Sequence, residues 1–228
     1  MNIAGLTKTT LLDYPNHVAC TVYIHGCNLN CPFCHNGQLL SVNNKAPLAE
    51  TAIFEFLIKR RNVLDGICIT GGEPTLQPGL IPFIKKVKAL GMKIKLDTNG
   101  LKPKVLAHLI EDNLIDYIAM DIKNSKEHYP RTVGINTVDI TKINQSIGLI
   151  KASGIPYEFR TTVMREFHTI DGLISIAQWL GRVDNYTLQN YKKSDNQLTD
   201  VTYTAFEKSE LETYRTRLSP YYLSIKVK

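Results

Sequence analysis

Three cysteines lie within eight residues of one another in the stretch HGCNLNCPFCHNG. The spacing of Cys27, Cys31 and Cys34, Cx3Cx2C, allows one short loop to present three thiolates to a compact metal centre. A cluster of four irons normally takes four thiolates, so three of them leave one iron open to an external ligand. The spacing therefore favours an iron–sulfur centre with a free coordination position.

A zinc site is the alternative for this loop. His25 or His35 could complete a Cys3His set, but structural zinc usually takes two pairs of ligands from separate loops, and no second ligand loop is evident. Cys20 and Cys68 lie inside apolar stretches, where a free cysteine usually behaves as a small buried hydrophobe. The odd total of five cysteines, without a recognisable export signal, favours reduced thiols or metal ligands over disulfides.

Further polar residues accompany the apolar runs that come later in the chain. A turn of Gly71, Gly72 and Glu73 follows GICIT, and glycine lets the backbone approach a ligand closely. The next three runs, KIKLDT, DYIAMDIK and YEFRTTVM, contain Asp97, Asp121, Lys123 and Arg160. Acids and bases together suit a zwitterionic ligand, although the same four groups could instead form a salt-bridge network.

These residues need elements that bring them together. Short β-branched runs alternate with segments of helical periodicity along the chain. The predicted strands are 17–24, 66–70, 93–98, 116–123, 157–164 and 185–191. The predicted helices are 48–61, 79–90, 102–113, about 138–153, 170–181 and about 203–217, and a last extended segment covers 221–227.

This alternation predicts parallel strands joined by right-handed crossovers. The polar residues follow the carboxyl ends of the strands, where ligand sites of parallel α/β folds gather. Residues that converge from nearly every strand favour a partial (β/α)6 TIM-like barrel over an open sheet, and six units are too few for a full eight-fold barrel. We therefore expect an α/β fold in a single domain over 1–228. Its core would lie at about 17–191, with a C-terminal helix and extended segment at about 203–228.

The composition is that of a globular chain, with 43% hydrophobic and 21% charged residues. The 27 Lys and Arg exceed the 21 Asp and Glu, which gives a net charge of +6. The basic residues are scattered without interleaved aromatic residues, so we expect a solvated surface and no nucleic-acid partner. No signal-like N-terminus and no apolar run of about 20 residues is evident, so we expect a cytoplasmic protein without a membrane partner.

The combined motifs resemble the signature of the radical S-adenosylmethionine (SAM) enzymes. The Cx3Cx2C loop follows the first predicted strand, Phe33 supplies the aromatic residue that this family favours before the third cysteine, and the GGE-like turn follows the second strand. The resemblance implies a [4Fe–4S] cluster on the three cysteines, with SAM bound to its open iron. It also implies cofactor contacts from Phe33, Gly71, Gly72, Glu73, Asp97, Asp121, Lys123 and Arg160.

The same resemblance gives the polar groups different parts of SAM. Backbone carbonyls of the glycine turn would receive the methionine ammonium, and Asp97 would lie near that amino group or near a bound monovalent cation. Asp121 would serve the ribose or the same cation, whereas Lys123 and Arg160 would serve the carboxylate. A ribose-contacting histidine that some relatives place near 188–191 is absent from this sequence.

Within the family, the segments CNLNCPFCHN, TGGEPTLQ, KLDTNG and YIAMDIK and the opening GLTKTTLLDYP resemble glycyl-radical-enzyme activating proteins. They are most similar to those that activate anaerobic ribonucleoside-triphosphate reductase, and the resemblance extends from about residue 3 to 165. It implies reductive cleavage of SAM, hydrogen abstraction from a glycine of the partner, and a flavodoxin or ferredoxin as electron donor. The interval between Cys34 and Gly71 contains no cysteine, so we expect a single cluster.

Three other functions remain open. A related activase could act on another glycyl radical enzyme, of the pyruvate formate-lyase type. A radical SAM enzyme could act on a small molecule, like the 7-carboxy-7-deazaguanine synthases, although these tend to follow the third cysteine with Asp-Thr where this chain has His35 and Asn36. A non-catalytic iron–sulfur or zinc-binding module would need neither the GGE-like turn nor polar residues at four strand ends.

Overall fold

The computed structural model describes residues 1–40 and 48–228. Its strands form one sheet in chain order from β1 to β8. They are β1 (Ile3–Thr10), β2 (Ala19–Ile24), β3 (Gly66–Gly71), β4 (Lys93–Thr98), β5 (Tyr117–Asp121), β6 (Tyr157–Val163), β7 (Val183–Asn190) and β8 (Tyr222–Val227). β1 is antiparallel to β2, and every neighbouring pair from β2 to β8 is parallel.

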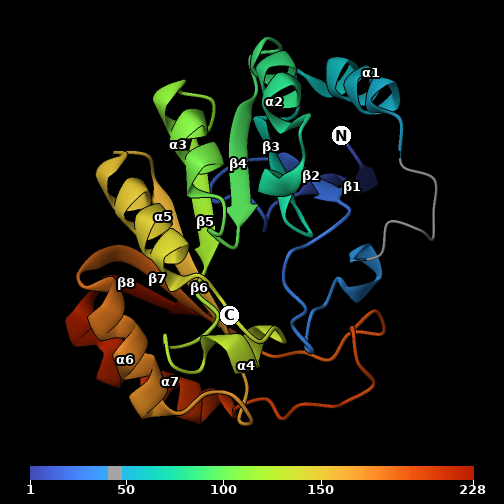
Figure 1. The fold of residues 1–228 in the computed structure, drawn as a ribbon. Coiled ribbons are helices and arrows are strands. Elements are labelled where there is room, and N and C mark those ends of the chain that lie inside the picture. Colours follow the sequence, from blue (N-terminus) through green and yellow to red (C-terminus); the bar gives the residue numbers. More distant parts are fainter. Residues whose placement is uncertain (41–47) are drawn as a thin grey trace.

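Helices connect the parallel strands and cover one face of the sheet (Figure 1). They are α1 (Glu50–Arg60), α2 (Leu80–Lys88), α3 (Pro103–Glu111), α4 (Tyr129–Val133), α5 (Ile140–Ala152), α6 (Ile170–Leu180) and α7 (Lys208–Leu218). In β4, Ile94 and Leu96 belong to the same buried apolar cluster as Leu106 of α3. Lys95 and Asp97 alternate with them and therefore point to the opposite face of the sheet. One face thus builds the core, and the other carries charged site residues.

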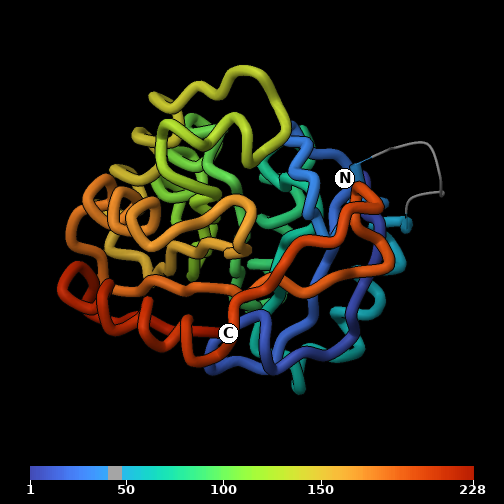
Figure 2. Tube along the Cα trace, turned by 90° about the horizontal axis from the view of Figure 1, so that it is seen from below, coloured from blue at the N-terminus to red at the C-terminus, as the bar shows by residue number. Residues whose placement is uncertain are grey.

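The partial (β/α)6 TIM-like barrel predicted from the sequence is confirmed. Its six units are β2–α1, β3–α2, β4–α3, β5–α5, β6–α6 and β7–α7, and β8 follows as a further parallel strand beside β7. β1 and β8 are the two edges of the sheet, so the barrel is incomplete. Seen from the carboxyl ends of the strands, the chain curves around a common centre (Figure 2).

Among the strands and α-helices, three differ from the prediction, and the others match it to within two residues. The sequence does not predict β1, because this edge strand is mostly half-buried or exposed and carries no clear apolar face. It does not predict α4, whose five residues are too few for a periodic pattern. α7 begins at Lys208 rather than near 203, because Glu207 and Glu210 form a capping box that fixes the first turn of the helix at Lys208. None of the helices in the described chain is long and apolar enough to cross a membrane.

Candidate active site

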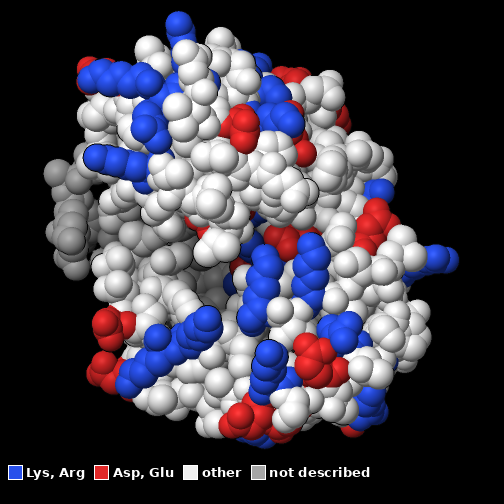
Figure 3. Space-filling model, turned by 180° about the vertical axis from the view of Figure 1, so that it is seen from behind, with Lys and Arg blue, Asp and Glu red and all other residues white. Residues whose placement is uncertain are grey.

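A cavity of about 390 Å³ lies where the parallel strands end. Its walls include all the site residues predicted from the sequence: Cys27, Cys31, Phe33, Cys34, Gly71, Gly72, Glu73, Asp97, Asp121, Lys123 and Arg160. They lie at the ends of β2 to β5 or in the loops that follow, apart from Arg160, which lies within β6. Figure 3 shows that the molecule is hollowed on one face, where Lys and Arg side chains gather.

The cysteine loop, residues 25–37, is fixed by backbone hydrogen bonds. The Asn30 N–H donates to the Val133 carbonyl at the end of α4 over 2.9 Å. Within the loop, the Cys34 N–H donates to the Cys31 carbonyl over 3.0 Å, which closes a tight turn. The second and third cysteines are therefore held close together on one wall of the cavity.

Burial controls the acidity of the thiols. Cys31 is buried, and Cys27 and Cys34 are partly buried. Burial raises the pKa of Cys31 to about 12, although the nearby Lys123 ammonium opposes this shift. Burial likewise raises the pKa of Cys27. These two thiols therefore stay protonated near neutral pH until metal binding supplies the positive charge that stabilises a thiolate.

The cysteine set fits a [4Fe–4S] cluster with one open iron. The three thiols line one cavity together, and each thiolate of such a cluster binds a separate iron. Cys20 and Cys68 are fully buried in β2 and β3, as predicted, and are not among the described residues of the cavity wall. The described residues also contain no group of three His, Cys, Asp or Glu side chains placed to hold a single metal ion.

Two glycines bring the turn after β3 into direct contact with the cysteine loop. Gly71 has a φ of +111°, a conformation that residues with a side chain rarely adopt. A Cβ atom at Gly72 would lie 2.0 Å from the carbonyl oxygen of Gly26. The Glu73 N–H donates to that same carbonyl over 2.8 Å. The close approach of two backbones therefore requires both glycines.

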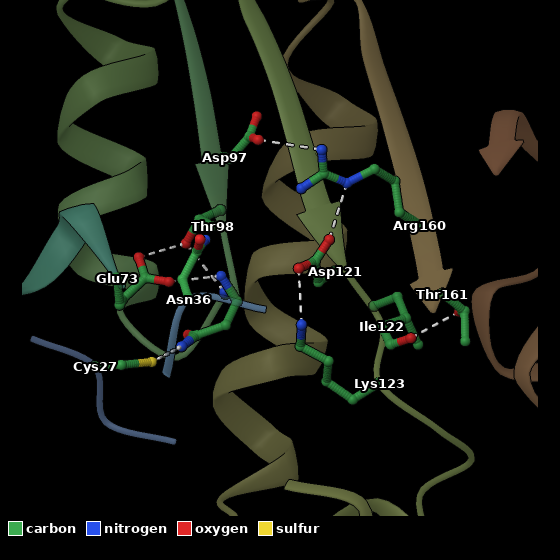
Figure 4. Close-up of polar contacts among 12 residues, drawn as sticks. Cys27, Asn36, Glu73, Asp97, Thr98, Asp121, Ile122, Lys123, Arg160 and Thr161 are labelled. Carbon is green, nitrogen blue, oxygen red and sulfur yellow. Dashed lines mark hydrogen bonds and ion pairs between the residues drawn. The ribbon is translucent and has the colours of Figure 1, made fainter. Parts of the chain in front are cut away.

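The Glu73 side chain is buried and joins this turn to the end of β4 (Figure 4). Its carboxylate accepts hydrogen bonds from the Asn99 N–H over 2.7 Å, the Thr98 hydroxyl over 2.8 Å and the Thr75 N–H over 3.1 Å. Burial raises the pKa of Glu73, and these donors oppose that shift. The carboxylate thus holds two loops of the site together, while its contact with SAM stays a prediction.

Five charged side chains on and beside three neighbouring strands form one ion-pair network. Figure 4 shows four of them, Asp97, Asp121, Lys123 and Arg160. Arg160 Nη1 lies 3.1 Å from Asp97 Oδ2, and Arg160 Nε lies 2.9 Å from Asp121 Oδ1. Lys123 Nζ pairs with the second oxygen of Asp121 over 2.8 Å, and Lys95 pairs with the second oxygen of Asp97. Lys123 and Arg160, two of the three cations of this network, line the cavity, where they suit a ligand with a carboxylate group.

The network keeps both carboxylates ionised. Burial acts to raise the pKa of Asp121, but the Arg160 guanidinium and the Lys123 ammonium outweigh it and hold that pKa well below its usual range. Arg160 and Lys95 lower the pKa of Asp97 against burial in the same way. The salt-bridge network that the sequence left open is therefore present. The four residues predicted to contact the ligand, Asp97, Asp121, Lys123 and Arg160, belong to this network and also line the cavity.

Asn99 and Lys95 are parts of the site that sequence reasoning missed. The buried Asn99 side chain donates through Nδ2 to Asn28 Oδ1 over 2.8 Å, and the same nitrogen lies 3.9 Å from Cys27 Sγ. With its backbone bond to Glu73, Asn99 links the loops that follow β2, β3 and β4. Both residues belong to the motif KLDTNG, but neither has a spacing or periodicity that marks it.

Comparison with known proteins agrees with this geometry. The family model described as the Radical SAM superfamily matches residues 21–180. A relative from Methanocaldococcus jannaschii, named "Putative glycyl-radical enzyme activating enzyme", is 32% identical over 200 residues, which are 85% of this chain and 81% of that protein. A 7-carboxy-7-deazaguanine synthase of Hyperthermus butylicus is 36% identical over 83 residues, which are 36% of this chain and 34% of that protein.

Solved structures share the fold. Streptococcus suis SuiB bound to precursor peptide SuiA has a TM-score of 0.70 at 14% identity, over 91% of this chain and 48% of that chain. The chain belongs to the radical SAM superfamily, and its long match to the M. jannaschii protein groups it with the glycyl-radical-enzyme activating branch. It is thus an enzyme of the oxidoreductase type whose family implies a [4Fe–4S] cluster and SAM as cofactors.

Proposed function

We propose that this protein generates a glycyl radical on a partner enzyme. The observation that carries the proposal is the single cavity in which the three thiols, the glycine turn and the ion-pair network meet. The match to the M. jannaschii relative supports a glycyl-radical partner over a small-molecule substrate, because the match to the deazaguanine synthase spans about a third of either chain.

The cysteine loop would hold the cluster. When bound, a reduced [4Fe–4S] cluster supplies the electron that cleaves SAM. Cys27, Cys31 and Cys34 would each bind one iron, and Phe33, which is buried and lines the same cavity, would help to exclude water from it. Lys123 would favour the bound thiolates, because its positive charge acts to lower the pKa of Cys31.

The charged residues would orient the amino-acid end of SAM. Lys123 and Arg160 present cationic groups to the cavity and would receive the carboxylate of SAM. Asp97, which Arg160 and Lys95 keep ionised, would accept hydrogen bonds from the ammonium group, together with carbonyls of the glycine turn. Asp121 would fix Arg160 and Lys123 in place through its two ion pairs and would face the ribose.

A monovalent cation near Asp97 and Asp121 is a further proposal. Its support is that two ionised carboxylates face one cavity, although the cation would share their oxygens with Lys95, Arg160 and Lys123. Rates of SAM cleavage in sodium, potassium and tetramethylammonium buffers test this proposal. Equal rates in all three buffers would contradict it.

The partner that we propose is anaerobic ribonucleoside-triphosphate reductase, with a flavodoxin or ferredoxin as electron donor and the cytoplasm as compartment. The motifs around the cysteines, the glycine turn and KLDTNG support this choice. We also propose that residues 1–228 form a single domain, which the continuous sheet supports. Lys192 and Lys228 line the cavity and would offer positive charge to an entering partner loop.

The test combines the anaerobically reconstituted protein, a reductant and SAM with the purified reductase. We expect the electron paramagnetic resonance (EPR) signal of a glycyl radical on the reductase, and we expect it to require SAM and all three cysteines. If SAM is cleaved but no radical forms on the reductase or on a pyruvate formate-lyase offered in parallel, the activase proposal is wrong while the radical SAM chemistry stands.

A further inference from the structure

The loop of residues 191–207 contains no helix or strand and lies outside the residues that the family model matches. It leaves β7, runs beside the cysteine loop and returns to α7 (Figure 2). Internal hydrogen bonds shape it: the Tyr191 hydroxyl donates to Gln197 Oε1 over 2.6 Å, and Gln197 Nε2 donates to the Thr199 carbonyl over 2.9 Å. Long loops of this kind in compact domains usually serve a function.

Two hydroxyl groups of the 191–207 loop bind the backbone of the cysteine loop. Thr199 Oγ1 donates to the Pro32 carbonyl over 3.0 Å, and Ser194 Oγ donates to the His35 carbonyl over 3.2 Å. Pro32 and His35 stand on either side of Cys34 in the sequence. The two bonds therefore fix the backbone both before and after the third cysteine.

The two loops also touch backbone to backbone at Gly37. A Cβ atom at this position would lie 2.6 Å from the Leu198 nitrogen and 2.8 Å from the Asn196 carbonyl oxygen. Any side chain there would push the loops apart, because these neighbours are main-chain atoms that cannot turn away. The contact thus depends on a glycine in the cysteine loop.

Aromatic rings extend the same contact. Phe33, next to Cys34, is buried with its ring centroid 6.3 Å from that of Tyr203. On the other side of Cys34, the His35 ring lies 6.3 Å from the Tyr191 ring. Both pairs are edge-to-face, a geometry that aromatic rings favour. The 191–207 loop therefore contacts the cysteine loop in three ways: through side-chain hydrogen bonds, through close backbone packing at Gly37 and through two edge-to-face aromatic pairs.

We propose that the 191–207 loop is a positioning element for the Cys34 half of the cysteine loop, with Ser194 and Thr199 as positioning residues. The other half has its own tether through Asn30 and Val133. A thiol held in one arrangement loses less conformational entropy when it binds iron, so a fixed loop retains its cluster better. This inference rests on the proposed role of Cys34 as a cluster ligand.

The contact itself can be tested in the full-length protein before a cluster is loaded. In the double variant Ser194→Ala/Thr199→Val, we expect the backbone amides of residues 33–37 to exchange hydrogen about tenfold faster, because both side-chain hydrogen bonds to the cysteine loop are lost. Thr202→Val is the matched control, since it removes a bond from Lys193 within the same loop and none to the cysteine loop. The swap Ser194→Thr/Thr199→Ser keeps both hydroxyls and should restore the wild-type exchange.

The functional consequence is measured as iron release from the reconstituted protein to a ferrous chelator. We expect release to be about tenfold faster in the double variant, and unchanged in Thr202→Val and in the hydroxyl swap. Equal exchange and equal release in the double variant and the control would overturn the inference. If the wild-type protein takes up no cluster, the proposed function fails, and the hydrogen exchange of residues 33–37 still decides whether the 191–207 loop positions them.

Discussion

The five cysteines differ in what surrounds each thiol, and this difference can be measured. Cys34→Ser should lower the iron content of the reconstituted protein sharply, because the thiol lines the cavity with two others. Cys20→Ser should retain the iron and lower the free energy of unfolding by about 1–3 kcal/mol, because a fully buried hydroxyl would lack a partner. Iron analysis and urea unfolding check both results. Equal iron contents in the two variants would contradict the assignment of the ligands.

Asn99 should tune the reduction potential of the cluster. An N–H group near a cluster sulfur stabilises the more negative reduced state, and Asn99 Nδ2 lies 3.9 Å from Cys27 Sγ. Asn99→Asp keeps the oxygen that accepts from the Leu101 N–H and loses the donor, so we expect a more negative midpoint potential. Thr98→Val, which removes one bond to Glu73, is the control. An EPR-monitored redox titration that gives one potential for both variants would refute this role.

Asp121 should make stability depend on pH on the acid side. Its folded pKa is held below the value of about 3.9 in an unfolded chain, so its ion pairs stabilise the fold above that value. This contribution is lost as the pH falls below about 4 toward the folded pKa. Asp121→Asn should therefore be less stable at neutral pH and lose less stability on acidification. Urea unfolding at a series of pH values measures this, and parallel stability curves would argue against it.

At the scale of elements, the position of the glycine turn depends on its contact with the start of the cysteine loop. Gly72→Ala should lower the free energy of unfolding by about 2 kcal/mol or more and weaken SAM binding, because the new Cβ would overlap the Gly26 carbonyl. Gly148→Ala in α5 meets no atom within 4 Å and should stabilise the helix by about 0.5–1 kcal/mol. Urea unfolding measures the stability of both glycine variants, and titration with SAM measures their affinity for it. If Gly72→Ala bound SAM with wild-type affinity, the contact between the glycine turn and Gly26 would not determine the geometry of the SAM site.

Elements with a clear period could be predicted from the sequence, as β4 at 93–98 shows. The location of the site could be predicted too, because the carboxyl ends of parallel strands meet at one edge. The pairing of Arg160 with both Asp97 and Asp121 could not, since it depends on where side chains of three strands meet. The hydrogen bond between Ser194 and His35 joins residues 159 positions apart, and a local sequence pattern cannot predict such a contact.

At the scale of the whole molecule, the chain carries a net charge of +6, and Lys and Arg side chains gather around the hollow that Figure 3 shows. Lys192 and Lys228 line the cavity, so Lys192→Glu should slow activation of the partner and weaken the dependence of that rate on salt. Lys142→Glu, which reverses the same charge on the outer helix α5, is the matched control. Initial rates of radical formation at several ionic strengths test this steering. Equal rates in the two variants would count against it.

Formation of 5′-deoxyadenosine by the reconstituted protein, with a reductant and without oxygen, tests the central claim most directly. We expect the product when SAM is added, together with a change in the EPR spectrum of the reduced cluster, and we expect neither in Cys34→Ser. A protein that holds iron and sulfide, forms no 5′-deoxyadenosine and keeps the same spectrum with SAM would contradict the claim that this cavity cleaves SAM.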